Sequence, residues 1–452
     1  MREPARHAVA PLYLLACLIF GGSAQGIWQN MALQLAGVIM IAWAAAAPSE
    51  ERLSKPARSL LVLAIAAIAV VAVQLIPLPP SLWAHGSRAA IAEGYGLLGE
   101  PLPMLPISLA PAETLSALFC VIPPLAMFSA MTRLHAYHPS WIAGALLAGT
   151  LAGVLLGAMQ VANPDPSSPW YLYPQVNWGS AVGFFANSNH MADLLLLAIP
   201  FVAAIAAAGQ HRNIQGYSAL VSVLAGIALV LIVGIALNRS LAGYGLALPV
   251  IAASLLIILP PRSRLRRALA GIAALALVGA IGALATTRIG GTAISSNAVV
   301  SVQSRQDILQ TTGKAIAANM PWGSGLGSFV RVYRLYESPD QVTSEYVIHA
   351  HNDYAEVVLE LGVAGIILIL LFLGWWLSAV MAVWRRGAAG PFSRAASIAS
   401  ATVLAHSLVD FPLRTAAIAA CFAACCALLI DRRVPVRQDR NDLWPTRHLV
   451  IR

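Results

Sequence analysis

Charged residues are scarce in this sequence. Only 10% of the 452 residues are Asp, Glu, Lys or Arg, whereas soluble domains carry about 25%. This shortage excludes a water-soluble globular enzyme, and the 59% hydrophobic content excludes an intrinsically disordered chain. With a mean hydropathy of +0.74, the composition is typical of a membrane protein with many spans.

Cysteine is scarce as well. The five cysteines all fall inside apolar runs, and an odd number cannot pair completely. This pattern excludes a disulfide-rich secreted module and predicts buried free thiols without a redox or metal role. The residues are Cys17, Cys120, Cys421, Cys425 and Cys426.

Apolar stretches, by contrast, are abundant, and twelve of them come close to the length of a membrane-spanning helix, about 20 mostly apolar residues. Helices are expected because lipid cannot satisfy exposed backbone polar groups. The sequence therefore predicts an all-α polytopic membrane protein with about 12 transmembrane helices. The predicted spans are 9–28, 31–47, 59–77, 112–130, 141–161, 188–208, 217–237, 241–259, 268–286, 362–384, 395–412 and 415–430.

The basic residues are distributed unevenly between the segments that connect these spans. With the N-terminus inside the cell, 20 of the 28 Lys and Arg fall on cytoplasmic segments and 8 on the outer side. Because cytoplasmic loops carry excess Lys and Arg, this split predicts that both termini are cytoplasmic. It also explains the net charge of +9 without a nucleic-acid partner.

Two alternatives at the N-terminus would remove the first span. Residues 2–26 resemble a signal peptide, with two arginines before an apolar run and Gly-Ser-Ala after it. The sequence LLAC, ending at Cys17, faintly resembles a lipoprotein cleavage site. Either alternative would disturb the even number of spans that the distribution of Lys and Arg supports.

The predicted organisation has four parts. Nine spans lie in 1–286, the largest periplasmic loop is 287–361, three spans lie in 362–430, and a basic cytoplasmic tail is 431–452. The tail is predicted to lie against the anionic inner leaflet.

Two smaller periplasmic loops lie within the first part. The loop 78–111 is rich in proline. The loop 162–187 has no Lys or Arg and is rich in aromatic residues, among them Trp170, Tyr171, Tyr173 and Trp178.

Two arginines stand out because lipid does not tolerate charged groups, which therefore point to function in such a chain. Arg239 lies in the triplet NRS, on a connection between spans that is too short to leave the membrane interface. It either snorkels to headgroup phosphates or grips a phosphate of a lipid-linked substrate. Arg305 lies in the first turns of 301–319, a predicted amphipathic helix that ends before Pro321.

The segment PWGSGLGSF, residues 321–329, follows this helix. Its three glycines at alternate positions predict a tight and irregular backbone. The segment is not a phosphate-binding P-loop, because it lacks the Gly-Lys-Ser/Thr ending and lies on the outer side.

The block HAHNDYAEVVLELG begins at His349 and leads directly into a span. On a helix, Asn352, Glu356 and Glu360 would share one face, and His349 would share another with Asp353. A metal site is one interpretation, but the two histidines of HAH would point apart and no ligand set has the spacing of a zinc motif. A general base, formed by a histidine that a carboxylate orients, is favoured.

Polar residues also mark the outer ends of two other spans. In HSLVDFPLR, His406 and Asp410 are one helical turn apart and Arg414 stands outside, which predicts at least a structural ion pair between His406 and Asp410. In GFFANSNH, Asn189 and His190 stand at the mouth of a span.

These motifs, in this order and spacing, resemble the O-antigen ligase and O-antigen polymerase family of bacterial envelope glycosyltransferases. The resemblance covers roughly residues 140–430 and rests on FFANSNHMA, NRS, SRQDILQ, MPWGSGLGSF and HAHNDYAEVVLELGVAGI. The last block is the most specific. HSLVDFPLR is similar to the exopolysaccharide-polymerase branch of the family, whereas NRS departs from the commoner Ser-Arg.

The resemblance implies a polytopic C-type glycosyltransferase with its active site at the periplasmic face of the bacterial inner membrane. The donor would be a glycan on undecaprenyl diphosphate, transferred to an acceptor sugar hydroxyl without a nucleotide sugar, cofactor or metal ion. By motif position, Arg239 and Arg305 would hold the donor diphosphate and His351 would be the catalytic histidine. The substrate-binding set would comprise Arg239, Arg305, His349, Asn352, Asn189, His190, Asp410 and Arg414.

Several functions remain open within and beyond this family. A ligase transfers the glycan to lipid A core sugars, a polymerase transfers it to a second lipid-linked glycan, and a third group transfers it to protein. We expect a ligase-like enzyme, with a polysaccharide polymerase as the alternative. A transporter or lipid flippase is a different class. Transporters place their sites near the membrane midplane, often between two similar halves, whereas the polar residues of this sequence gather on the outer side.

Overall fold

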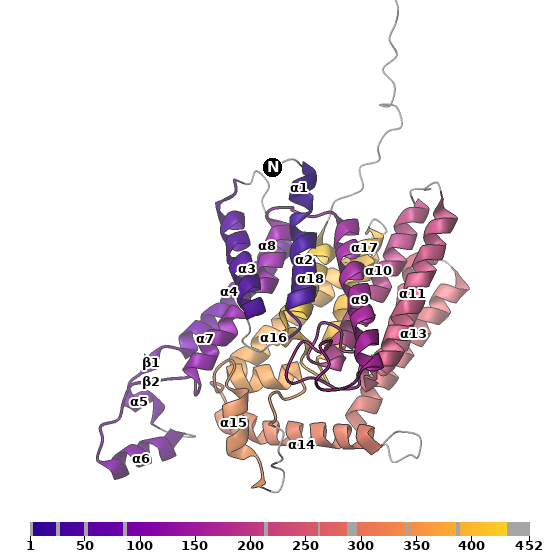
Figure 1. The fold of residues 1–452 in the computed structure, drawn as a ribbon. Helices are drawn as coiled ribbons and strands as arrows, with labels where there is room; N and C mark the ends of the chain where they lie inside the picture. The colour runs from indigo at the N-terminus through magenta and orange to yellow at the C-terminus, as the bar shows by residue number, and fades with distance from the viewer. Residues whose placement is uncertain are drawn as a thin grey trace, which may run out of the picture.

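The computed structural model describes residues 3–23, 28–48, 53–84, 88–211, 216–260, 263–286, 296–339, 342, 346–385 and 389–431. Most of the long helices run side by side in one bundle, and α14 lies across one end of it (Figure 1). We call this end the α14 end. The first described residues, from Glu3 onward, lie at the opposite end (Figure 1).

Helices make up nearly all of the regular structure in this described part. Two-residue strands β1 and β2 pair antiparallel, Pro77 with Pro106 and Leu78 with Leu105. In chain order the elements are α1 (Glu3–His7), α2 (Val9–Phe20), α3 (Trp28–Ala46), α4 (Lys55–Gln74), β1 (Pro77–Leu78), α5 (Pro80–Trp83), α6 (Ala89–Leu98), β2 (Leu105–Pro106), α7 (Pro111–Phe119), α8 (Ile122–Thr132), α9 (Pro139–Ala162), α10 (Ser188–His211), α11 (Tyr217–Asn238), α12 (Leu241–Ile258), α13 (Arg264–Thr286), α14 (Ser296–Asn319), α15 (Phe329–Tyr336), α16 (Asp353–Arg385), α17 (Pro391–His406), the short 3₁₀ helix η3 (Pro412–Arg414) and α18 (Ala416–Ile430).

The predicted class is confirmed: this is an all-α polytopic membrane protein. Within the described residues, eight helices are long and apolar enough to cross a membrane, and two shorter apolar helices, Pro4–Phe20 and Ala416–Ile430, accompany them. The two other predicted spans coincide largely with α13 and α17. The number of twelve spans stays a prediction.

Several boundaries differ from the sequence prediction. The first predicted span ends at Phe20, and the span 112–130 is broken between α7 and α8, where two prolines occupy the first turn of α8. Proline fits there because its missing N–H is not needed at a helix start. The loop 78–111 holds α5 and α6 as well as the β1–β2 pair. The tail from 432 onward lies outside the described residues.

The cysteine prediction is correct for four residues and wrong for one. All five cysteines are free thiols, and Cys17, Cys421, Cys425 and Cys426 are buried. Cys120, at the break between α7 and α8, is exposed instead.

Helix α10 forms the centre of the bundle. In its apolar stretch 83% of the residues are buried, compared with 11% in α4, and it packs against α9, α11, α12 and α17. A helix that is apolar on all sides belongs in an interior, whereas α4 presents its apolar surface to lipid. Polar residues at the start of α10 therefore have to find partners inside the protein.

The described ends of the chain lie together, at the end of the bundle opposite α14. The Arg6 Nε donates a hydrogen bond of 2.8 Å to the carbonyl oxygen of Leu134. Nearby, the Tyr137 hydroxyl donates one of 2.6 Å to Asp431, directly after α18. The start of α2 and the end of α18 therefore lie at the same end of the bundle. This is consistent with an even number of membrane crossings from α2 through α18.

Helix α16 is broken at Gly362, which has φ +61° and ψ −140°. The break prevents the carbonyls before it from accepting helical hydrogen bonds, so other groups take their place. The N–H of Ser324 donates to Leu359 O at 3.0 Å, and the N–H of Gly325 donates to Glu360 O at 2.9 Å. In return the Val363 N–H donates to Pro321 O at 2.9 Å.

The predicted irregular backbone of PWGSGLGSF is therefore confirmed and explained. Gly323, Gly325 and Gly327 all have positive φ, between 76° and 103°. A Cβ at Gly323 would lie 2.4 Å from Glu360 O. The glycines permit the segment to lie directly against the broken helix, which positions α14 and α15 relative to the bundle.

Replacing Gly362 by alanine should disrupt this junction. The added Cβ would lie 2.1 Å from Pro321 O at a backbone conformation that disfavours alanine, so we expect a loss of about 2–5 kcal/mol of stability. The measurement is the thermal unfolding midpoint of the purified protein. Gly374→Ala is the matched control, because a Cβ added at this glycine of the same helix would meet no atom within 4 Å. A similar loss in both variants would contradict this account of the junction.

Candidate active site at the α14 end

The triplet NRS forms a very short connection between α11 and α12, held by its two outer residues. The Asn238 side chain is buried and donates to the carbonyls of Ala181 at 2.8 Å and Ser188 at 2.7 Å. The Ser240 hydroxyl donates to Asn189 Oδ1 at 2.7 Å and accepts from the Gly243 N–H, which caps α12. These contacts fix the connection to the start of α10.

Arg239, between them, is exposed and has φ +61°. Among the described residues, the other non-glycine residues with positive φ are His135 and His351. This left-handed conformation costs roughly 1–2 kcal/mol for a residue with a Cβ, and such strain is often retained at functional sites. Arg239 and His351, which the sequence analysis predicts to be site residues, thus share a rare backbone conformation.

Arg305 lies on α14, which confirms the predicted amphipathic helix over 301–319. The side of α14 that carries Ile308 and Ala315 packs into a small core with Phe329 and Val332. Arg305 itself is half-buried and forms no hydrogen bond or ion pair with another described residue. Its positive charge nevertheless acts on Asp410, whose pKa it lowers.

His351 is oriented by a buried carboxylate. Its Nδ1 lies 3.2 Å from Asp410 Oδ1, in the connection after α17. Burial by itself would raise the pKa of Asp410, but the hydrogen bond from His351 and the positive charge of Arg305 hold that pKa well below its usual range. With Nδ1 donating to an ionised carboxylate, Nε2 of His351 is left as a proton acceptor.

The predicted helical face that would join His349 to Asp353 is wrong, because α16 begins at Asp353 and both histidines precede it. The start of α16 is instead bound to the end of α17. The N–H of Asp353 donates to Ser407 O at 2.9 Å, and the Asn352 side chain donates to Leu408 O at 2.9 Å. Asn352 also caps α16, accepting from the Ala355 N–H.

The other predicted face, Asn352, Glu356 and Glu360, is confirmed for the two glutamates by their common partner, whereas Asn352 precedes α16. Arg414 Nη2 lies 3.3 Å from Glu356 and 3.1 Å from Glu360, and its Nε lies 3.6 Å from Asp353. These carboxylates are buried. Arg414 is thus surrounded by three acidic groups, and these contacts hold α16 against η3.

His349 joins the same network. Its Nδ1 lies 2.8 Å from Glu356 Oε1, and the Ala350 N–H donates to the other oxygen of Glu356 at 2.9 Å. Glu356 is thus shared between His349 and Arg414, whereas Asp410 has the ring of His351 as its ion-pair partner. This difference favours a structural role for His349 and a chemical one for His351.

The Phe411 ring lies at the centre of the histidines. Ring centroids of His349, His351 and His190 lie 4.0, 5.1 and 5.1 Å from it. Phe411 is itself buried, so three imidazoles from α10 and the segment before α16 converge on one aromatic side chain.

The predicted ion pair between His406 and Asp410 is wrong. α17 ends at His406, so Asp410 lies beyond the helix and turns to His351. His406 Nδ1 instead approaches Asp193 Oδ1 at 2.7 Å, and both side chains are fully buried. This pair joins α17 to α10 beneath the site.

Three features of the site escaped the sequence prediction: the pairing of Asp193, the central position of Phe411 and the shared partner of the α16 carboxylates. Asp193 was detectable in principle, because a carboxylate inside an apolar span marks a functional or paired position. The partners themselves could not be read from the sequence. Asn189 lies in the first turn of α10, at the mouth of the span as predicted, and its amide oxygen accepts a hydrogen bond from Ser240.

The described residues contain no group of three or more His, Cys, Asp or Glu side chains arranged to hold a metal ion. The arrangement combines instead two arginines and a histidine, His351, whose Nε2 has no hydrogen-bond partner among the described residues. It is suited to binding an anionic group and accepting a proton next to it.

The fold and this site define a polytopic membrane protein with two arginines and a carboxylate-paired histidine at one end of its bundle. Residues 226–370 match the family model described as O-antigen ligase. This match supports the resemblance over that range, which includes Arg239, Arg305 and both histidines of HAH. No curated protein matches the chain.

The buried pair of His406 and Asp193 leads to a stability prediction. His406→Phe should lower stability by about 3–5 kcal/mol, because it leaves a carboxylate buried without its cation. Adding Asp193→Leu should restore much of that loss, since an apolar pair of similar size has no charge to bury. Thermal unfolding of the purified variants measures both effects. If the two single losses add in the double variant, the residues are not coupled and the pairing is wrong.

Proposed function

We propose that this protein is a glycosyltransferase that moves a glycan from undecaprenyl diphosphate to an acceptor sugar hydroxyl. The observation that carries the proposal is the combination, at one end of the bundle, of Arg239 and Arg305 with a carboxylate-oriented histidine, His351. The O-antigen ligase domain supports the class of reaction.

The two arginines supply what a diphosphate leaving group requires. A guanidinium donates two hydrogen bonds to a phosphate and keeps its charge at any working pH. Arg239 is held on a rigid connection between two helices, and Arg305 lies on the helix that crosses the same end of the bundle. Fixed positive charges of this kind stabilise negative charge as it develops on the leaving oxygen.

His351 supplies the proton acceptor. The acceptor hydroxyl oxygen attacks the anomeric carbon of the glycan, and its proton passes to Nε2 of His351. The bond between that carbon and the diphosphate oxygen breaks, and its electron pair leaves with undecaprenyl diphosphate. Asp410 holds the imidazole in the required tautomer and stabilises the imidazolium that forms.

The α14 end would face the periplasm of a bacterial inner membrane, with both termini in the cytoplasm. Support comes from the 20:8 distribution of basic residues and from the position of the chain ends opposite α14. We favour a ligase that uses lipid A core as acceptor. The alternative is a polysaccharide polymerase, which the similarity of HSLVDFPLR to that branch supports, with a second lipid-linked glycan as acceptor.

The assignment of roles predicts different outcomes for the two histidines. In vesicles containing lipid-linked donor, acceptor and EDTA, His351→Ala should slow single-turnover transfer by about 10²–10⁴-fold while donor affinity stays near that of the wild type. His349→Ala is the matched control from the same motif and should be much less impaired. Near-normal transfer by His351→Ala would rule out its role as base, and transfer that needs a divalent ion would rule out the metal-independent scheme.

A further inference from the structure

The segment 163–187, between α9 and α10, has no helix or strand but is held firmly by one buried side chain. Gln160 Oε1 accepts from the N–H groups of Val182 and Gly183, and its Nε2 donates to the carbonyls of Trp170 and Gly183. All four hydrogen-bonding positions of the amide are thus used. Irregular segments of this length are uncommon and usually functional.

The aromatic residues of this segment are of two kinds: buried tyrosines that anchor the backbone, and tryptophans whose rings are partly exposed. Tyr171 and Tyr173 are 8% and 6% exposed, and their hydroxyls donate to the carbonyls of Gln160 and Phe184. Trp170 and Trp178 are 37% and 39% exposed. Trp178 is fixed from behind by Tyr171, whose ring centroid lies 4.6 Å away.

This segment is joined to the connection that carries Arg239. The Ala181 N–H donates to Leu237 O at 3.3 Å, and the Ala181 carbonyl accepts from Asn238 at 2.8 Å. Trp178 is three residues away, so its Cα lies within about 11 Å of Ala181. The segment lies near the α14 end of the bundle (Figure 1).

The chemistry of the exposed surface indicates what it binds. Residues 163–187 contain no Lys or Arg and one acidic residue, Asp165, among amides and hydroxyls. The segment therefore lacks the basic residues that would attract lipid phosphates. Exposed indole faces surrounded by neutral polar groups suit a sugar, whose C–H groups pack against the electron-rich ring while its hydroxyls form hydrogen bonds.

We propose that residues 163–187 form a saccharide-binding platform, on which Trp170 and Trp178 hold the glycan part of the lipid-linked donor. The proposal rests on the proposed function, because the platform adjoins the arginine assigned to the donor diphosphate. It gives the site a second point of attachment: Arg239 binds the diphosphate, and the platform binds sugars farther along the glycan.

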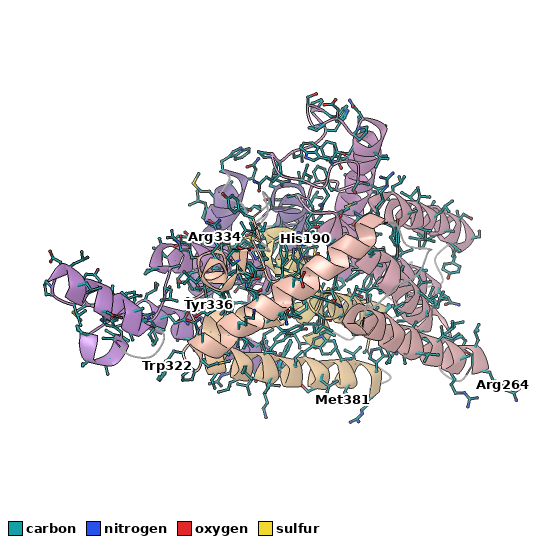
Figure 2. All side chains as sticks on the ribbon, turned by 90° about the horizontal axis from the view of Figure 1, so that it is seen from below. His190, Arg264, Trp322, Arg334, Tyr336 and Met381 are labelled. Carbon is teal, nitrogen blue, oxygen red and sulfur yellow. The ribbon has the colours of Figure 1, made fainter. Side chains whose placement is uncertain are left out.

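The test compares two donors, undecaprenyl diphosphate carrying a complete oligosaccharide repeat and undecaprenyl diphosphate carrying one sugar. Trp178→Ala and Trp170→Ala should each raise the KM for the oligosaccharide donor about tenfold and leave the KM for the single-sugar donor unchanged. Trp322→Ala is the control, because Trp322 is 71% exposed and lies at the far end of α14 from His190 (Figure 2).

A direct binding measurement separates this proposal from the proposed function. Wild-type protein should bind the oligosaccharide released from the donor in calorimetry, and the double variant Trp170→Ala, Trp178→Ala should not. Equal increases in KM for both donors, as expected of a membrane anchor, would overturn the platform, as would unchanged oligosaccharide binding by the double variant. If wild-type protein binds the oligosaccharide but transfers from neither donor, the platform stands and the proposed function fails.

Discussion

The ion pairs between Arg414 and the carboxylates of α16 determine where both histidines of the site lie. Arg414 stands just after α17, and its contacts with Glu356 and Glu360 hold the first turns of α16 against that region. A buried arginine and buried carboxylates need one another, because either charge alone would be costly in an apolar interior. The chain before α16 is consequently confined, which brings His351 to Asp410 and His349 to Glu356.

The same constraint extends from α16 to the rest of the α14 end. The break at Gly362 exposes backbone carbonyls that the glycine segment satisfies, and this places α14 with Arg305 over the bundle. On the opposite side, Asn238 and Ser240 fix the connection that holds Arg239 in a strained conformation. Local hydrogen bonds thus determine the position of each proposed functional group, while the charges of both arginines stay free of ion pairs with the described residues.

The sequence predicted the helical class, the amphipathic helix at 301–319 and the acidic face of α16, because hydrophobic length and 3.6-residue periodicity are local properties. Arg239 and Arg305 stood out as charged groups in an apolar chain, and the family motifs gave their roles and singled out His351. Pairings across the fold were not predictable: His406 was expected to bind Asp410, yet α17 ends at His406 and its partner is Asp193. Periodicity assumes a continuous helix, and it fails where a helix ends or breaks.

The claim that Arg239 is held in a strained conformation to bind the donor diphosphate can be tested in one variant. Arg239→Gly removes the guanidinium and relieves the positive φ, so stability and ligand binding should change in opposite directions. The account predicts that thermal stability rises by about 1 kcal/mol while affinity for undecaprenyl diphosphate in vesicles falls at least tenfold. Unchanged affinity for undecaprenyl diphosphate would contradict the account.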